Sequence, residues 1–192
     1  MFSLKKNLKF ININQDYLKY LHKFCSEVYY KPTGYETKPY IGILVQENNS
    51  EYVIPLSSAK EKHKTWKNVD VDRFLIFENC DKPEYGSRDI YVKNPDGSFK
   101  HILSVMDLKK MIPIKQGLYT EVNLNPTAND TDSDKKYKVL LNIEYTFCIK
   151  IMNSIIQKAS KLYDKQISTG KIVKFCCDFK LLEEKCKEYK CK

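Results

Sequence analysis

The hydrophobic residues near the N-terminus recur at intervals of three and four positions, the spacing of one face of an α-helix. The residues that share this face are Tyr17, Leu18, Leu21 and Phe24. Asn14 precedes them, and its side chain can accept hydrogen bonds from the first N–H groups of a helix. We therefore predict a short helix after Asn14. The next segment, Tyr29–Pro39, combines Pro and Gly with Lys and Tyr and predicts a loop that could border a binding site.

Short runs of β-branched and aromatic residues then predict strands. Tyr40–Val45 and Tyr52–Leu56 are separated by the turn signal Glu47–Ser50, so together they predict a β-hairpin. Directly after it, Ser57–Lys60 predicts a turn or a helix N-terminus, where hydroxyl and backbone N–H groups can hold an anion. Further short strands are expected at Phe74–Glu78, at Ile90–Val92 and near Tyr119.

The middle of the chain combines a helix-start signal, an extended segment and a polar loop. Ser104–Asp107 resembles a capping box and predicts a short helix that continues through Lys110. Met111–Ile114 is expected to be extended, and Pro113, which lacks an N–H group, keeps it near a sheet edge. Asn123–Lys136 is rich in Asn, Thr, Asp and Pro and predicts an exposed loop.

The C-terminal half carries the longest helical pattern of the sequence. Apolar residues from Tyr137 to Tyr163 follow helical spacing almost without interruption, which predicts one long amphipathic helix or two in tandem. Gly170 ends this pattern, a short strand is expected at Ile172–Cys176, and Asp178 is expected to cap a last helix. There is no internal repeat and no linker long enough to divide the chain. We therefore expect a single domain over residues 1–192.

The composition favours a polyanionic partner. Lys and Arg number 33 against 24 Asp and Glu, which gives a formal net charge of +9 and a pI near 9.0. Nucleic acid is the first candidate and an anionic membrane surface the second. The 14 Tyr and nine Phe offer rings on which unpaired bases could stack, although most of them are expected in the core. Nearly all of the positive charge is Lys, and an AT-rich genome also produces that bias.

The chain lacks the signals of export and of cofactor chemistry. It contains no run of about eighteen apolar residues and no signal peptide, so we expect a cytoplasmic protein that does not enter a membrane. Seven cysteines, an odd number, then predict reduced thiols. The four cysteines near the C-terminus lack the CxxC spacing of structural zinc sites, and the three histidines belong to no metal motif. No glycine-rich nucleotide motif occurs, so we expect neither a metal nor a cofactor.

One short motif, Ser57-x-x-Lys60, matches the SxxK pattern of penicillin-recognising serine hydrolases. The SDN and KTG elements that accompany it in those enzymes are missing. From this segment alone, the default interpretation is a helix cap followed by a solvated lysine.

Three separated stretches carry a resemblance to a known family. They are Tyr40–Ile43 followed by Tyr52–Lys60 and His63, then the LKKMIPI sequence of Leu108–Ile114, and finally the CDFKLLEEK sequence of Cys177–Lys185. In this order they resemble the ToxN/AbiQ family of type III toxin–antitoxin endoribonucleases. The resemblance covers most of the chain from Tyr40 to Tyr189.

This resemblance implies an α+β fold in which helices surround a strongly bent antiparallel sheet, similar to the Kid/MazF toxin barrel, with a long helix in the C-terminal half. It also implies an endoribonuclease toxin that cuts cellular or phage RNA, often in defence against bacteriophage by abortive infection. A small antitoxin RNA of pseudoknotted repeats holds the toxin inactive. The toxin trims the precursor of this RNA and closes with it into a cyclic assembly.

The resemblance also implies roles for individual residues. The catalytic positions of the family motif correspond to Ser57, Ser58 and Lys60, and the RNA-binding candidates are Lys38, Tyr35, Tyr40 and His63. Without a metal, RNA is cleaved when its own 2′-hydroxyl attacks phosphorus, leaving a 2′,3′-cyclic phosphate and a 5′-hydroxyl. Lys60 suits the stabilisation of negative charge on the phosphorane. Ser58 suits the relay or positioning of a proton, and Ser57 suits the binding of the non-bridging oxygens. The expected substrate is A-rich RNA.

Two alternatives stay open at this point. A MazF-like ribonuclease toxin with a protein antitoxin would share the fold and the activity. A non-catalytic RNA-binding protein would share the charge and the aromatic residues, yet would tolerate Ser58→Ala. A direct-repeat array beside the gene would favour the RNA antitoxin.

Overall fold

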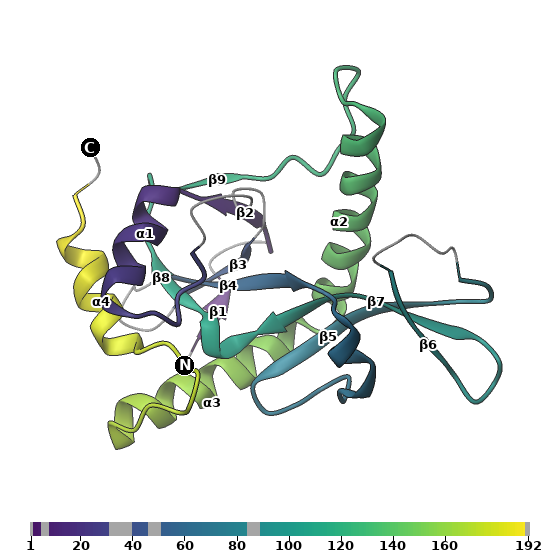
Figure 1. Ribbon diagram of the computed structural model, residues 1–192. Coiled ribbons are helices and arrows are strands. Elements are labelled where there is room, and N and C mark those ends of the chain that lie inside the picture. Colours follow the sequence, from purple (N-terminus) through teal and green to yellow (C-terminus); the bar gives the residue numbers. More distant parts are fainter. Residues whose placement is uncertain (1, 5–7, 31–39, 46–50, 84–88, 191–192) are drawn as a thin grey trace. The chain divides into compact units, whose positions relative to one another are not determined.

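A computed structural model of the chain describes residues 2–4, 8–30, 40–45, 51–83 and 89–190, with the backbone alone for Leu4 and residues 40–45 (Figure 1). The described helices are α1 (Gln15–Phe24), α2 (Asp132–Lys150), α3 (Met152–Thr169), α4 (Phe179–Glu188) and the 3-10 helices η1 (Glu61–Thr65) and η2 (Leu108–Lys110). The described strands are β1 (Ser3–Leu4), β2 (Phe10–Ile13), β3 (Tyr40–Val45), β4 (Glu51–Ser58), β5 (Arg73–Cys80), β6 (Ile90–Lys93), β7 (Phe99–Asp107), β8 (Ile112–Ile114) and β9 (Tyr119–Glu121). Helices and antiparallel strands together confirm the α+β class.

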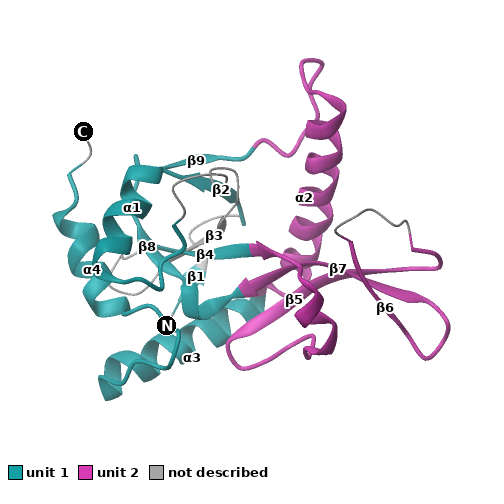
Figure 2. Cartoon of the chain, in the orientation of Figure 1, with its two compact units in different colours: residues 1–56, 107–122, 153–192 teal, residues 57–106, 123–152 magenta. Residues whose placement is uncertain are grey.

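The chain packs into two compact units, which Figure 2 distinguishes by colour. Unit 1 comprises residues 1–56, 107–122 and 153–192, and unit 2 comprises residues 57–106 and 123–152. Because each unit is assembled from separated segments, neither corresponds to one continuous stretch of sequence. The expectation of a single domain over residues 1–192 stays a prediction.

In unit 1, the strands run in the order β4, β3, β2, β9, while β1 pairs with β3 and β8 with β4. The predicted hairpin is confirmed, because Tyr40 of β3 faces Pro55 of β4 in an antiparallel register. The predicted cap of α1 is also confirmed, since Asn14 Oδ1 accepts the N–H groups of Asp16 at 2.8 Å and Tyr17 at 3.1 Å. Helix α1 lies beside α4 (Figure 1).

The core of unit 1 is an aromatic cluster around a shared carboxylate. Tyr52 and Phe179 are fully buried, and Tyr163 stacks on Phe179 with ring centroids 5.8 Å apart. Phe2 contacts both tyrosine rings edge-on at 5.3 Å. Glu183 Oε1 accepts both tyrosine hydroxyls at 2.8 Å, so the buried phenol groups keep hydrogen-bond partners. This pairing explains why a carboxylate stands on the inner face of α4.

Unit 2 is built around β7. Strand β5 is its neighbour, and β6 pairs with it in an antiparallel hairpin whose turn contains Gly97 at φ +90°, a conformation that favours glycine. Helix α2 packs against β5, where the rings of Phe77 and Phe147 meet edge-on at 5.3 Å. The buried core of this unit is the cluster Leu75, Ile90, Ile102 and Val105, against which Ala59, Trp66, Phe77 and Val92 pack.

The helix predicted to start at Ser104 begins later than expected. Ser104 to Met106 are buried residues of strand β7, so the capping box is wrong. Asp107 is the actual cap, because its Oδ1 accepts the N–H of Lys109 at 3.1 Å at the start of the short helix η2. Burial of Ser104 within the strand therefore prevails over its local preference for a cap.

The C-terminal half differs from expectation in two places and confirms a third prediction. Helix α2 begins at Asp132, within the predicted loop, because Thr131 and Asp134 form a reciprocal capping box. The chain leaves the helical conformation at Ile151, so of the two predicted alternatives, one long helix or two in tandem, the second is confirmed. Residues 172–176 contain a turn and no strand, since Phe175 has a positive φ of 63°.

Within the described residues, no single helix is long and apolar enough to span a membrane. Of the described helices, only α2 and α3 taken together have the length and the composition that a span needs.

Candidate active site

The residues expected to carry the chemistry lie at the end of β4, in unit 2. The ladder continues past Ser58, because Ala59 N–H donates to the carbonyl of Leu103 in β7 at 3.1 Å. Lys60 is also extended, with φ −141° and ψ 159°. Successive side chains of an extended chain point to opposite faces, so Ser58 and Lys60 share one face, and both are exposed. The predicted turn or helix N-terminus at Ser57–Lys60 is confirmed in part, because Ser57 and Ser58 end strand β4 and Lys60 is the N-cap of the 3-10 helix η1.

The two serines of the motif lie on different sides of this strand. Ser57 shares the inner face with Ala59, which packs against the core of unit 2. Its hydroxyl makes a long contact of 3.5 Å with the carbonyl of Val105, at the limit of a hydrogen bond. The structure thus brings Ser58 and Lys60 together and turns Ser57 away from them.

A buried histidine fixes the backbone around Lys60. His63 N–H donates to the carbonyl of Lys60 at 2.8 Å, and Lys60 N–H donates to Nδ1 of His63 at 2.9 Å. Because Nδ1 accepts, the ring is the neutral tautomer with its proton on Nε2. The side chain of His63 is 3% exposed. The N–H and the carbonyl of Lys60 are therefore both held by His63, while its side chain is exposed.

The ring of Trp66 packs on this histidine and contacts two cationic side chains. Its ring centroid lies 4.5 Å from that of His63 and 4.1 Å from Cζ of Arg73, and Lys62 Nζ lies 5.5 Å away. Arg73 is held in place by Asp70, whose Oδ2 accepts from Nη2 at 2.7 Å. Cations over an indole face are stabilised by its electron distribution, so Trp66 holds two positive charges close to His63.

The pKa of His63 is lowered from 6.5 to about 4, mainly because burial disfavours the charged imidazolium. The positive charges of Lys62, Lys60 and Arg73 lower it further. Protonation would also remove the acceptor that Nδ1 offers to Lys60 N–H. The turn that presents Lys60 therefore requires a neutral His63.

This pKa shift predicts a pH dependence of stability. Between pH 6.5 and about 4, the unfolded chain binds a proton at His63 and the folded chain does not, so the free energy of unfolding falls as the pH decreases. We expect His63→Asn to flatten this part of the profile, because an amide oxygen accepts the Lys60 N–H without titrating. Urea denaturation of both proteins across this window measures the slope. An unchanged slope in His63→Asn would contradict the assignment.

The predicted RNA-binding residues are placed unevenly. Lys38 and Tyr35 lie outside the described residues, and Tyr40 is described by its backbone alone, in β3. The ring of His63 is buried and supports the turn, so direct contact with RNA does not fit its position. In the part of the chain that the structure describes, no three His, Cys, Asp or Glu side chains converge as metal ligands.

Sequence reasoning missed Trp66, Arg73 and Lys62. Two of them stand out in the sequence by their rarity, since Trp66 is the only tryptophan and Arg73 one of two arginines in the chain. Rarity does not indicate where a side chain lies in the fold. Nothing in the spacing indicated that these residues contact the histidine of the motif.

Comparison with known proteins supports the assignment made from the sequence. The family model described as toxin ToxN of type III toxin-antitoxin systems matches residues 9–187. Endoribonuclease ToxN of Bacillus thuringiensis subsp. kurstaki is 28% identical, over 97% of this chain and 86% of the relative. Endoribonuclease AbiQ of Lactococcus lactis subsp. lactis is 29% identical, over 97% of this chain and 91% of the relative.

Solved structures agree with these relatives. The structure of AbiQ, a lactococcal anti-phage endoribonuclease of a type III toxin-antitoxin system, has a TM-score of 0.69 and 25% identity, covering 96% of this chain and 98% of that chain. A structure from work on selective toxin inhibition by a non-coding RNA pseudoknot has a TM-score of 0.68 and 27% identity, covering 97% and 100%. The family model alone spans far more than half of the sequence. The chain therefore belongs to the ToxN toxin family of type III toxin-antitoxin systems.

Proposed function

We propose that this chain is an endoribonuclease toxin whose chemistry is carried by Ser58 and Lys60. The observation that carries the proposal is the extended end of β4, where a hydroxyl and an ammonium group two residues apart share an exposed face. The buried His63 holds the backbone between them in one conformation. The names of the relatives, endoribonucleases ToxN and AbiQ, support the reaction class.

The proposed reaction is metal-independent transphosphorylation of RNA, at A-rich sites. The 2′-hydroxyl attacks the adjacent phosphorus, the 5′-oxygen leaves, and the products carry a 2′,3′-cyclic phosphate and a 5′-hydroxyl. Lys60 stabilises the negative charge that builds on the phosphorane oxygens, and Ser58 positions or relays a proton. A direct contact of the Ser57 hydroxyl with the phosphate has less support, because that hydroxyl faces the carbonyl of Val105.

His63 is unsuited to be the general base. Its Nδ1 already accepts the N–H of Lys60, and in this tautomer Nε2 carries the proton. We assign it instead to positioning Lys60. The predicted RNA-binding role of His63 then acts through the turn that it holds, while Lys38, Tyr35 and Tyr40 remain proposed direct contacts.

The proposed partner is a small antitoxin RNA of pseudoknotted repeats, which the toxin processes and which inhibits it in a cyclic assembly. The formal charge of +9 suits such a polyanion. Structures similar to this chain come from work on a processed non-coding RNA that regulates an antiviral system and on inhibition by an RNA pseudoknot. Cellular or phage RNA is the proposed target, in the cytoplasm and in phage defence.

We further propose that both compact units act as one toxin domain over residues 1–192. The four crossings of the chain between the units support this, because neither unit can be separated by one cut. The likeness of the sheet to the strongly bent Kid/MazF barrel stays a prediction, since the described strand pairings form an open path.

One experiment tests the proposed reaction. The purified protein is incubated with A-rich RNA in an excess of EDTA, and the ends of the products are mapped by mass spectrometry. We expect undiminished cleavage with 2′,3′-cyclic phosphate and 5′-hydroxyl ends. Activity lost in EDTA and restored by Mg²⁺, or products with 5′-phosphate ends, would overturn the mechanism. Tight RNA binding without cleavage would favour the non-catalytic alternative.

A further inference from the structure

The segment between α3 and α4 in unit 1 contains a strained turn. Cys176 N–H donates to the carbonyl of Val173 at 3.0 Å, which closes a four-residue turn with Phe175 in its third position. Phe175 has φ +63°, and among the described residues it is the only non-glycine residue with a positive φ. Glycine or asparagine normally occupies this position, because a Cβ atom crowds the backbone there. A phenylalanine at this position therefore costs stability.

The core of the protein does not explain this phenylalanine. Phe175 is 59% exposed, and the neighbouring Ile172 and Val173 are 50% and 40% exposed. An exposed ring gains little from the hydrophobic effect, so neither burial nor backbone geometry favours it here. Strain that persists without an internal benefit is typical of residues that serve a partner.

The turn is held firmly at both ends. Gly170, with φ +65°, ends α3 with its N–H on the carbonyl of Gln166 at 2.9 Å. The buried Gln166 side chain donates to the carbonyl of Cys177 at 3.0 Å and accepts the N–H of Phe179 at 2.7 Å. This side chain therefore ties α3 to the segment that follows the turn. Phe175 is presented in a fixed orientation, which lowers the entropy that a partner must remove on binding.

The charges around Phe175 indicate what kind of partner fits. Lys171 precedes Ile172, and Lys174 stands between Val173 and Phe175. Lys174 Nζ lies 4.9 Å from the ring centroid of Phe175. A ring with an ammonium group at its face suits one nucleotide of single-stranded RNA. The unpaired base stacks on the ring, and the phosphate of the nucleotide binds the ammonium group. An anionic membrane fits the charge, but its affinity grows with buried apolar area, and besides one ring this segment offers only the partly exposed side chains of Ile172 and Val173.

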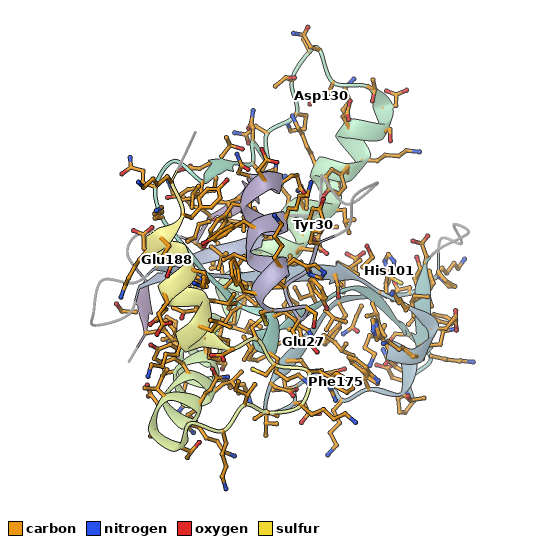
Figure 3. The ribbon with its side chains drawn as sticks, turned by 60° about the vertical axis from the view of Figure 1, so that its left-hand side comes forward. Glu27, Tyr30, His101, Asp130, Phe175 and Glu188 are labelled. Carbon is orange, nitrogen blue, oxygen red and sulfur yellow. The ribbon has the colours of Figure 1, made fainter. Side chains whose placement is uncertain are left out.

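We propose that Phe175 and Lys174 of unit 1 form a second RNA contact, which takes one unpaired base of single-stranded RNA. Figure 3 labels Phe175. The proposal rests on the proposed function, because it assigns the partner to be RNA. In this contact Phe175 supplies stacking, Lys174 supplies the charge, and the braced turn supplies the orientation.

The test measures binding and cleavage separately. Fluorescence anisotropy with a labelled single-stranded A-rich RNA is measured in the Ser58→Ala background, so that the RNA is not consumed. We expect Phe175→Gly to weaken binding by about 10-fold, because it removes one base-stacking ring, and Phe175→Trp to retain the affinity. Phe175→Gly is also expected to keep or raise the melting temperature, because glycine relieves the strained turn. If Phe175→Gly loses affinity while its melting temperature is unchanged or higher, the loss cannot arise from misfolding.

Phe24 provides a matched control, since it is 43% exposed and Lys185 Nζ lies 4.8 Å from its ring centroid. Its helical backbone carries no strain, and we expect Phe24→Ala to bind RNA like the parent. Equal losses in both variants, or parental affinity in Phe175→Gly, would overturn the proposal. So would binding to phosphatidylserine vesicles that Phe175→Gly abolishes while RNA affinity stays unchanged. Failure of RNA cleavage would instead count against the proposed function, because cleavage is assayed separately with Ser58 present.

Discussion

Replacement of Lys60 by alanine is expected to reduce the rate of RNA cleavage by about 100-fold or more, because it removes the cation proposed to stabilise the phosphorane. The side chain of Lys60 is exposed, and its backbone is held by His63, so the fold should tolerate the change. Single-turnover cleavage of an A-rich RNA measures the rate, and circular dichroism with thermal unfolding checks the fold. Ser58→Ala is expected to act in the same direction.

Lys64→Ala is the control for charge. Lys64 is exposed on η1 and pairs with Glu61 at 2.8 Å, so its removal lowers the net charge by the same amount as Lys60→Ala. We expect cleavage by Lys64→Ala to stay within about 3-fold of the parent, since an exposed ion pair contributes little. Equal losses in the two variants would mean that Lys60 acts only through the general positive potential. Full activity in Lys60→Ala would remove it from the active site.

Replacement of Gln166 by leucine is expected to lower the free energy of unfolding by about 2 to 4 kcal/mol, because two buried backbone groups lose their partners. Gln166 is 4% exposed and bonds the carbonyl of Cys177 and the N–H of Phe179. Leucine has a similar volume, so the loss reports on the hydrogen bonds more than on packing. Urea denaturation followed by circular dichroism gives the free energy.

The matched control is Gln157→Leu, on an exposed position of the same helix, α3. A change there is expected within about 0.5 kcal/mol. If Gln166→Leu is equally mild, the braced segment between α3 and α4 is not a source of stability. The fixed presentation of Phe175 would then lose its structural basis.

Local signals in the sequence predicted the parts of the fold that local chemistry controls. The side chains of Asn14 and Asp178 cap α1 and α4 as expected, since a cap needs only its own first turn. The hairpin of β3 and β4 also follows from short-range preferences. Predictions failed where a distant contact outweighed a local one, as at Ser104, which is buried in β7.

In the candidate site, too, local sequence predicted some features and contacts between distant residues decided others. The motif placed Ser57, Ser58 and Lys60 together in the sequence, yet the pleat of an extended chain separates Ser57 from the other two. His63 was expected to contact RNA, and its burial under Trp66 gives it a supporting position instead. Its neighbour Arg73 comes from the next strand, β5, and no sequence spacing encodes that contact.

The sequence by itself determined the family, the α+β class, the basic charge and the segment that carries the candidate chemistry, because motif residues and net charge are properties of the chain in any conformation. The tertiary structure alone decided which side chains share a face, that His63 is neutral and buried, and that Phe175 stands strained and exposed. These properties depend on desolvation and on contacts between residues far apart in the chain. Only the folded chain creates them, by excluding water and bringing separate strands together.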